Sequence, residues 1–147
     1  MIHKSLWSSA RGDWGTPPDL FRALDAEFHF TLDAAANDKN AKCAKYFTPE
    51  TDALTQSWKT EGAVWCNPPY GRGIGKWCEK AYQTALDGQT VVMLIHARTD
   101  TAWFHDWVYG KAEIRFLRSR LHFTDSDGNP TDRAPFPSLI AIYRGKE

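Results

Sequence analysis

A stretch of nine residues, 62–70, most constrains how this chain can fold. It begins with the apolar run Ala63-Val64-Trp65-Cys66, which has the length and residue types of a buried strand. Two prolines then follow Asn67, and proline has no backbone N–H to donate to a neighbouring strand. We therefore expect the chain to leave a sheet at Asn67 and to turn at the carboxyl end of a strand, the edge where open α/β sheets bind ligands.

The residues of this turn suit the attack of a planar exocyclic amine. The Asn67 side-chain oxygen and the Pro68 carbonyl can each accept one N–H of such an amine, which aims the nitrogen lone pair at an electrophile. The Tyr70 ring can stack on a base, because every base has a π face. The candidate catalytic residues are therefore Asn67, Pro68, Pro69 and Tyr70. The competing interpretation is an ordinary Pro-Pro turn after a strand.

The composition favours a single soluble domain. With 147 residues, 42% of them apolar and 24% charged, the chain can bury roughly two-thirds of its unfolded surface. We expect a flexible segment at 1–12 and one domain at 13–147. No apolar run is long enough to span a membrane and no secretory signal is visible, which predicts a cytoplasmic protein. Three cysteines without a CxxC motif predict reduced thiols and no metal site. The net charge of zero argues against tight unassisted DNA binding, but it allows a local basic patch.

Two upstream segments are candidates for a ligand site. Trp14, Thr16 and Pro17 precede an amphipathic helix at 19–28, which Thr16 or Asp19 can cap. A strand at 28–33 ends at Asp33, and the small residues that begin with Ala34 leave room for a ligand to approach. Asp33 can pair with a cationic group, or it can cap a helix. Asp52, after a short extended piece at 46–49, is either an acceptor for a ligand amine or a solvated turn residue.

Downstream of Tyr70, the pattern predicts three further strands and a hairpin. A flexible mouth at 71–76 leads into a helix at 77–86, and the apolar strand 90–95 completes a βαβ unit. A helix at 100–109, a strand at 112–117, a hairpin within 124–134 and an antiparallel strand at 139–143 follow. The candidate contacts to phosphates are the basic residues Arg72, Lys76, Arg98, Arg115, Arg118 and Arg120. For Arg98 the alternative is a structural ion pair.

The combination and order of these motifs resemble the phage-type DNA N6-adenine methyltransferase family, sometimes called phage Dam. The resemblance runs from about Trp14 to Tyr143. It rests on the segments Trp14-Gly15-Thr16-Pro17, Leu32-Asp33, Asp52-Ala53-Leu54, Trp65-Cys66-Asn67-Pro68-Pro69-Tyr70-Gly71 and Ala134-Pro135-Phe136-Pro137-Ser138. The chain departs from most Rossmann-like methyltransferases in having no glycine after Asp33.

The resemblance implies an abbreviated Rossmann-like class I methyltransferase sheet, mostly parallel with an antiparallel C-terminal strand and with helices on both faces. It implies S-adenosylmethionine as cofactor, bound by Trp14, Thr16, Pro17, Asp33, Ala34, Asp52 and Asn67, with Asp33 facing the methionine ammonium. The expected substrate is adenine in double-stranded DNA, flipped onto Tyr70, in a bacterial or phage-infected cell. No separate target-recognition domain is expected, so base choice falls to the loops 71–76 and 124–137, or to a homodimer or accessory subunit. Methylation of RNA or of a protein glutamine amide remains an alternative, as does a non-catalytic cofactor- or DNA-binding subunit.

Overall fold

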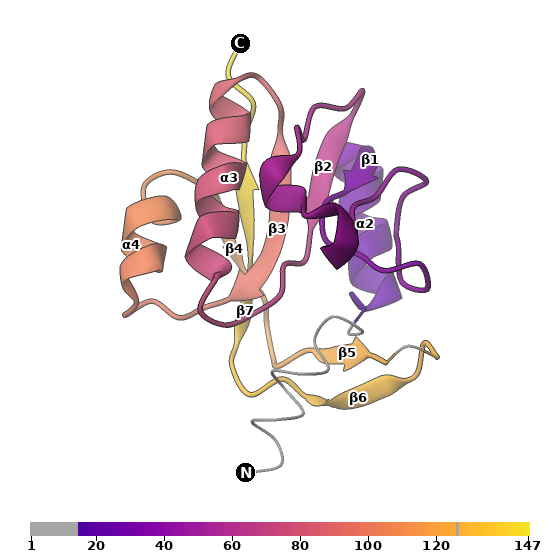
Figure 1. Cartoon of the computed structure of the whole chain (residues 1–147). Coiled ribbons are helices and arrows are strands. Elements are labelled where there is room, and N and C mark those ends of the chain that lie inside the picture. Colours follow the sequence, from indigo (N-terminus) through magenta and orange to yellow (C-terminus); the bar gives the residue numbers. More distant parts are fainter. Residues whose placement is uncertain (1–14, 126) are drawn as a thin grey trace.

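A five-stranded mixed sheet forms the centre of the molecule (Figure 1). The computed structural model describes residues 15–125 and 127–147. The segment 1–12, expected to be flexible, and Trp14 lie outside this part. The strand order is β1-β2-β3-β7-β4, with β1 (Phe30–Asp33), β2 (Ala63–Cys66), β3 (Val91–His96), β4 (Glu113–Phe116) and β7 (Ser138–Tyr143).

The first three strands are parallel, and β7 is antiparallel to both of its neighbours. The expectation of a mostly parallel sheet with an antiparallel C-terminal strand is therefore confirmed. β2, β3 and β7 are buried along their whole length, as their nearly continuous apolar sequences predict. β1 starts two residues later than expected, because His29 adopts a left-handed conformation (φ 58°) where the preceding helix ends.

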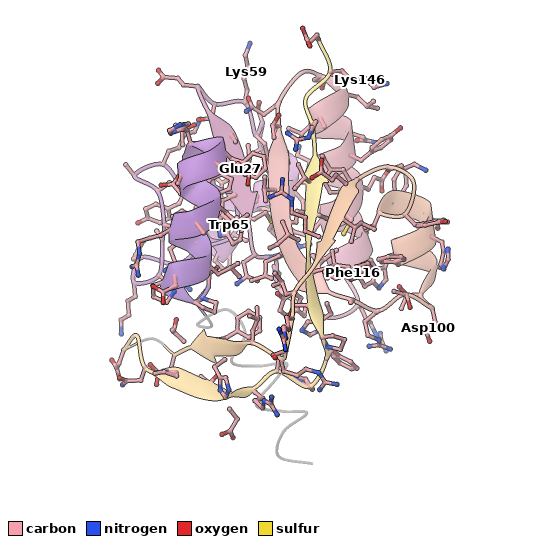
Figure 2. The ribbon with its side chains drawn as sticks, turned by 180° about the vertical axis from the view of Figure 1, so that it is seen from behind. Glu27, Lys59, Trp65, Asp100, Phe116 and Lys146 are labelled. Carbon is pink, nitrogen blue, oxygen red and sulfur yellow. The ribbon has the colours of Figure 1, made fainter. Side chains whose placement is uncertain are left out.

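Helices cover both faces of the sheet, as expected (Figures 1 and 2). On one face lies α2 (Pro18–Phe28), whose Phe21 ring is 5.5 Å from the rings of Phe30 and Trp65. The opposite face carries α3 (Ile74–Leu86) and α4 (Ala102–Trp107). The buried side of α3 consists of small and aliphatic residues at helical spacing, which lets it pack closely on β3 and β7.

Two local predictions were wrong. Neither Thr16 nor Asp19 caps α2: the N-cap is Pro17, Thr16 instead bonds to the turn after β2, and Asp19 pairs with Arg22 on the helix surface. The helix α3 begins at Ile74 rather than Trp77, so the second half of the expected mouth is helical. The carbonyls of the glycines just before it accept the first helical N–H groups, for example Ile74 N–H to Gly71 O at 3.2 Å.

The segment between β1 and β2 returns alongside the sheet edge. Phe47 N–H donates to the Asp33 carbonyl and Asp33 N–H donates to the Lys45 carbonyl, both at 3.0 Å. This confirms an extended piece next to β1. Two short 3-10 helices, η2 (Pro49–Thr51) and η3 (Ala53–Thr55), follow and place Asp52 between them. The fold-back makes a wall over the carboxyl end of β1.

The expected hairpin forms a separate two-stranded sheet beyond the carboxyl ends of the parallel strands (Figure 1). It consists of β5 (His122–Thr124) and β6 (Pro130–Arg133). Gly15 and Thr124 exchange two backbone hydrogen bonds, of 2.7 and 3.0 Å, which fix the hairpin to the chain just before Thr16. None of the helices in the described ranges is long and apolar enough to cross a bilayer.

Candidate functional site

The Asn-Pro-Pro-Tyr turn leaves the sheet directly after β2, as the prolines require. The Tyr70 hydroxyl lies 2.8 Å from Asn67 Oδ1 and 3.1 Å from the Leu94 carbonyl of β3, and it can donate its proton to either oxygen. Asn67 Nδ2 donates to Thr16 Oγ1 at 3.3 Å. Burial raises the pKa of Tyr70 well above its usual range, so the phenol stays a neutral donor. The Asn67 amide is thus held at both ends.

The Tyr70 ring does not face solvent in this structure. It is only 4% exposed and stacks on the imidazole of His96, with ring centroids 4.0 Å apart and planes at 26°. The Phe123 ring of the hairpin meets it edge-on at 6.1 Å. The sequence predicted that Tyr70 stacks on a base. In this structure the ring stacks on a histidine of β3, and stacking on a base stays a prediction.

Asp33 ends β1 in a buried position, 2% exposed. Its carboxylate accepts backbone N–H groups from Lys42 at 3.0 Å and from Ala35 at 3.2 Å. Burial raises the pKa of this carboxyl to about 6, although the two N–H groups oppose the shift. No helix follows Asp33, so the alternative role as a helix cap is wrong.

The Asp33 side chain lines a small void that Thr16, Asn40, Lys42 and Asn67 also border. A larger cavity of about 170 Å³ adjoins it, with Asn67, Asn40 and Ala35 common to both. Most of the lining of the larger cavity is apolar: Ala34, Ala35, Ala36, Asn40, Phe47, Thr48, Pro49, Asp52, Ala53, Asn67, Pro69 and Trp77. The structure therefore brings together Thr16, Asp33, Ala34, Asp52 and Asn67, five of the residues expected to hold a ligand.

Pro17 borders neither cavity. Instead it begins α2, and its rigid φ places Thr16 next to the sheet edge.

Sequence reasoning missed several lining residues, namely Asn40, Phe47, Thr48, Pro49 and Trp77. Four of them lie in the segment that folds back beside β1. This contact is non-local, and no hydrophobic periodicity in the local sequence predicts it. Trp77 had a signal, because a chain with seven tryptophans has more indole rings than a core of this size needs. Its position on the first turn of α3, after the Asn-Pro-Pro-Tyr turn, points to a cavity wall.

The six basic candidates do not form one cluster. Arg72 and Lys76 are exposed beside the turn, and Arg118 is exposed near the hairpin. The Arg98 guanidinium lies 4.4 Å from the centre of the Phe136 ring. Arg120 donates to the Pro135 carbonyl at 2.9 Å. This bond links the residues just before the hairpin to the segment between β6 and β7.

Arg115 has a structural role that its sequence context does not reveal. Its guanidinium forms two hydrogen bonds, of 2.7 and 2.8 Å, to the carboxylate of Glu27 on α2 (Glu27 is labelled in Figure 2). It also pairs with Glu113 at 3.2 Å. Both carboxylates hold Arg115 on the face that α2 covers, which favours a structural ion pair over the expected phosphate contact.

Comparison with known proteins identifies the family of the chain. The family model described as DNA N-6-adenine-methyltransferase (Dam) matches residues 4–147. The chain belongs to this family. It is 31% identical to the DNA N-6-adenine-methyltransferase of Haemophilus phage HP1 over 99% of its own length and 87% of that protein.

The DNA N-6-adenine-methyltransferase of Escherichia phage T1 is 32% identical over 94% of the chain, which spans 58% of that protein's length. A putative methyltransferase of Escherichia coli K12, YfdM, is 40% identical over 39% of the chain and 69% of its own length. The Dam family is one of adenine-specific DNA methyltransferases, so the resemblance read from the motifs is confirmed.

Proposed function

We propose that this chain transfers a methyl group from S-adenosylmethionine to the N6 amine of adenine in double-stranded DNA. One observation carries the proposal above the others. Asn67 borders both cavities and its amide is fixed by Thr16 and Tyr70, so a hydrogen-bond acceptor for an amine lies at the edge of a cavity that can enclose part of a ligand. Membership of the Dam family supports the substrate class.

The sheet order supports a Rossmann-like methyltransferase core, abbreviated at the β1 edge. In such sheets ligands bind outside the carboxyl ends of the parallel strands. Asp33 ends β1 and Asn67 directly follows the adjacent parallel strand β2. The two strands are in register through the pair Asp33 and Trp65, so both residues lie at that edge. The fold-back of 45–47 occupies the position beside β1 where a longer sheet would add another strand.

The chemistry of the cavity fits the cofactor. A nucleoside needs flat apolar walls and a few polar groups, and the rings of Phe47 and Trp77 together with the Asp52 carboxylate offer both. A buried carboxylate with a raised pKa, such as Asp33, is stabilised by a cation, and the methionine ammonium is one. The volume of about 170 Å³ is below the roughly 300–1,000 Å³ of small-molecule sites, so the cavity encloses part of the cofactor.

When bound, S-adenosylmethionine supplies an electrophilic methyl group. The chain's own residues position the adenine amine that receives this methyl group. Asn67 Oδ1 has two lone pairs, so it can accept an N–H of adenine while the Tyr70 hydroxyl is still donating to it. The Pro68 carbonyl follows the last ladder pair of β2, and no described residue donates to it, which leaves it for the second N–H. Such positioning can contribute about 7–11 kcal/mol. The proton of the methylated amine then leaves to water.

Access to the amine requires the adenine to leave the duplex, at a cost of a few kcal/mol. We assign the exposed basic residues at the two ends of the carboxyl edge to the flanking phosphates: Arg72, Lys76, Arg98, Arg118 and Arg120. Base choice is assigned to the segments 71–76, of which the part from Ile74 is helical, and 124–137, or to a second subunit. These contacts are few, in line with the zero net charge.

The experiment is a methyl-transfer assay with tritiated S-adenosylmethionine and three acceptors: unmethylated duplex DNA, RNA and total protein. The proposal predicts label in DNA that is lost in Asn67→Ala, while calorimetry with S-adenosylhomocysteine still detects binding. Label in RNA alone or in protein alone would show that the same site methylates that substrate and not DNA. No label and no cofactor binding by a folded sample would favour a non-catalytic subunit.

A further inference from the structure

A continuous series of ring contacts runs along the carboxyl edge of the sheet next to the Asn-Pro-Pro-Tyr turn. The Tyr70 ring stacks on His96 at 4.0 Å, and the His96 ring contacts Phe136 at 5.1 Å. Phe136 in turn carries the Arg98 guanidinium at 4.4 Å. These groups come from the turn after β2, from the end of β3 and from the segment before β7. The imidazole is the smallest ring of the series and lies against the tyrosine of the turn.

His96 is an unusual residue for its position. It ends the fully buried strand β3 and is only 4% exposed, whereas every preceding residue of the strand is apolar. Its cross-strand neighbour is Ser138, which is 1% exposed and whose hydroxyl has no hydrogen-bond partner among the described residues. Buried hydroxyls almost always have a hydrogen-bond partner, so the Ser138 hydroxyl has unused capacity for a polar group that comes next to it.

We propose that His96 is a placeholder for the target base: its imidazole covers the face of Tyr70 on which adenine stacks, and it moves aside when adenine enters. The inference rests on the proposed function and deepens it. The imidazole and a purine are both flat aromatic rings, so either can satisfy the same face of Tyr70. The Ser138 hydroxyl then lies next to the entering base and can bond to one of its ring nitrogens.

The placeholder has a clear physical consequence. Stacking on His96 stabilises the resting protein, so each binding event must first give up that contact. The stacking free energy of an aromatic pair is large enough that loss of the His96–Tyr70 contact weakens the apparent affinity for DNA by about two- to tenfold. His96 contacts no reacting group and acts through the availability of Tyr70, which makes it a positioning residue.

Two substitutions at His96 separate a placeholder from a structural residue. His96→Ala removes the ring that competes with the base, so kcat/KM for unmethylated duplex DNA rises two- to tenfold. His96→Phe leaves a ring that stacks more firmly and cannot be solvated as easily, so kcat/KM falls below that of the wild type. A purely structural role predicts the opposite order, with Phe close to His and Ala the least active. His29→Asn is the matched control. His29 is exposed at the amino end of β1, away from the turn, and asparagine tolerates its positive φ.

Histidine NMR tests the movement without relying on methyl transfer. In the wild-type protein we expect nuclear Overhauser cross-peaks between the His96 ring protons and the Tyr70 ring, with assignment from their absence in His96→Phe. Addition of dAMP should remove these cross-peaks, and dCMP at the same concentration should remove them less. Thermal unfolding of each variant identifies a change that arises from loss of folding.

The outcomes distinguish this inference from the proposed function. Wild-type protein that transfers no methyl group to DNA contradicts the proposed function, and the response of His96 to dAMP still decides whether the ring is a placeholder. Wild-type activity together with a fall of kcat/KM in His96→Ala and rescue in His96→Phe overturns the placeholder alone. Persistence of the His96–Tyr70 cross-peaks at saturating dAMP overturns it as well.

Discussion

The Tyr70 hydroxyl lies 2.8 Å from Asn67 Oδ1 and 3.1 Å from the Leu94 carbonyl, and it therefore ties the turn to the central strand β3. Because a hydroxyl has one proton, the two oxygens share it. The contact fixes the direction in which the Asn67 carbonyl points, and this direction decides which N–H of an incoming amine it accepts. Tyr70 thus has two separable roles, a ring and a hydroxyl.

Tyr70→Phe should separate these roles. Loss of the hydroxyl removes its hydrogen bonds and leaves the buried Leu94 carbonyl without this donor, which lowers the free energy of unfolding by about 1–3 kcal/mol. We expect kcat to fall about tenfold, since the Asn67 amide gains rotational freedom. Tyr70→Ala also loses the ring and should abolish turnover. Denaturant titration and initial rates on DNA measure the two effects; equal kcat in Tyr70→Phe and wild type would show that the hydroxyl does not orient Asn67.

Thr16 is expected to orient the same amide from the other end. Thr16→Val keeps the shape but removes the acceptor for Asn67 Nδ2, while Thr16→Ser keeps the hydroxyl. The valine variant should lose about tenfold in kcat and the serine variant should remain close to wild type. The rates are compared at saturating S-adenosylmethionine, so that a weaker cofactor site does not mimic the effect. A valine variant as fast as the serine variant contradicts this role.

Asp33 predicts a pH dependence of stability. Its pKa is raised to about 6 in the folded protein by burial, from an ordinary 3.8, so the folded state binds this proton more tightly than the unfolded state. Its contribution to stability is present below pH about 4 and is lost as the pH rises to about 6. The difference approaches about 3 kcal/mol. Asp33→Asn should therefore gain unfolding free energy relative to wild type between these pH values, as urea titrations in steps of half a pH unit can show; a constant difference would contradict the assignment.

The same carboxyl predicts how cofactor binding responds to pH. A cationic ammonium binds the ionised form, so the affinity for S-adenosylhomocysteine should be constant above pH 7 and should weaken below pH about 6, with proton release on binding. Calorimetry in two buffers of different ionisation enthalpy counts the protons. Binding that is independent of pH between 5 and 8 would place the ammonium away from Asp33.

Gly62, which leads into β2, tests the packing that positions the turn. A Cβ at this position would collide with the backbone carbonyl of His29, which accepts the N–H of Ala63. Gly62→Ala should lower the unfolding free energy by about 1–3 kcal/mol. Gly73→Ala is the matched control, because it meets open space. The midpoints of thermal unfolding of both variants compare them directly; equal midpoints would show that the approach of His29 is not tight.

The elements built from local pattern were predictable from the sequence. The apolar strands around Val64 and Val92, the helix from Pro18, and the stop at Asn67 follow from residue types and from the prolines alone. The position of Asp33 and Asn67 at the same edge of the sheet was predictable as well, because neighbouring parallel strands end at the same edge. What sequence could not supply is non-local: the fold-back that brings Phe47 to the cavity depends on a backbone pairing with β1.

Two side chains show the same limit. Thr16 has the residue type of a helix cap, but tertiary structure uses its hydroxyl for Asn67, because Pro17 starts the helix without it. Arg115 lies in the densest basic stretch, but Glu27, 88 residues away, takes its guanidinium. In both cases the neighbouring sequence is compatible with several hydrogen-bond partners, and the tertiary packing determines which partner is used.

We propose above all that the Asn67 amide holds an adenine amine for methylation. The most direct test is mass spectrometry of nucleosides from unmethylated duplex DNA after incubation with S-adenosylmethionine and either the wild-type protein or Asn67→Ala. We expect N6-methyldeoxyadenosine with the wild type and none above background with the variant, while both bind S-adenosylhomocysteine. Equal amounts of N6-methyldeoxyadenosine from both proteins would contradict it.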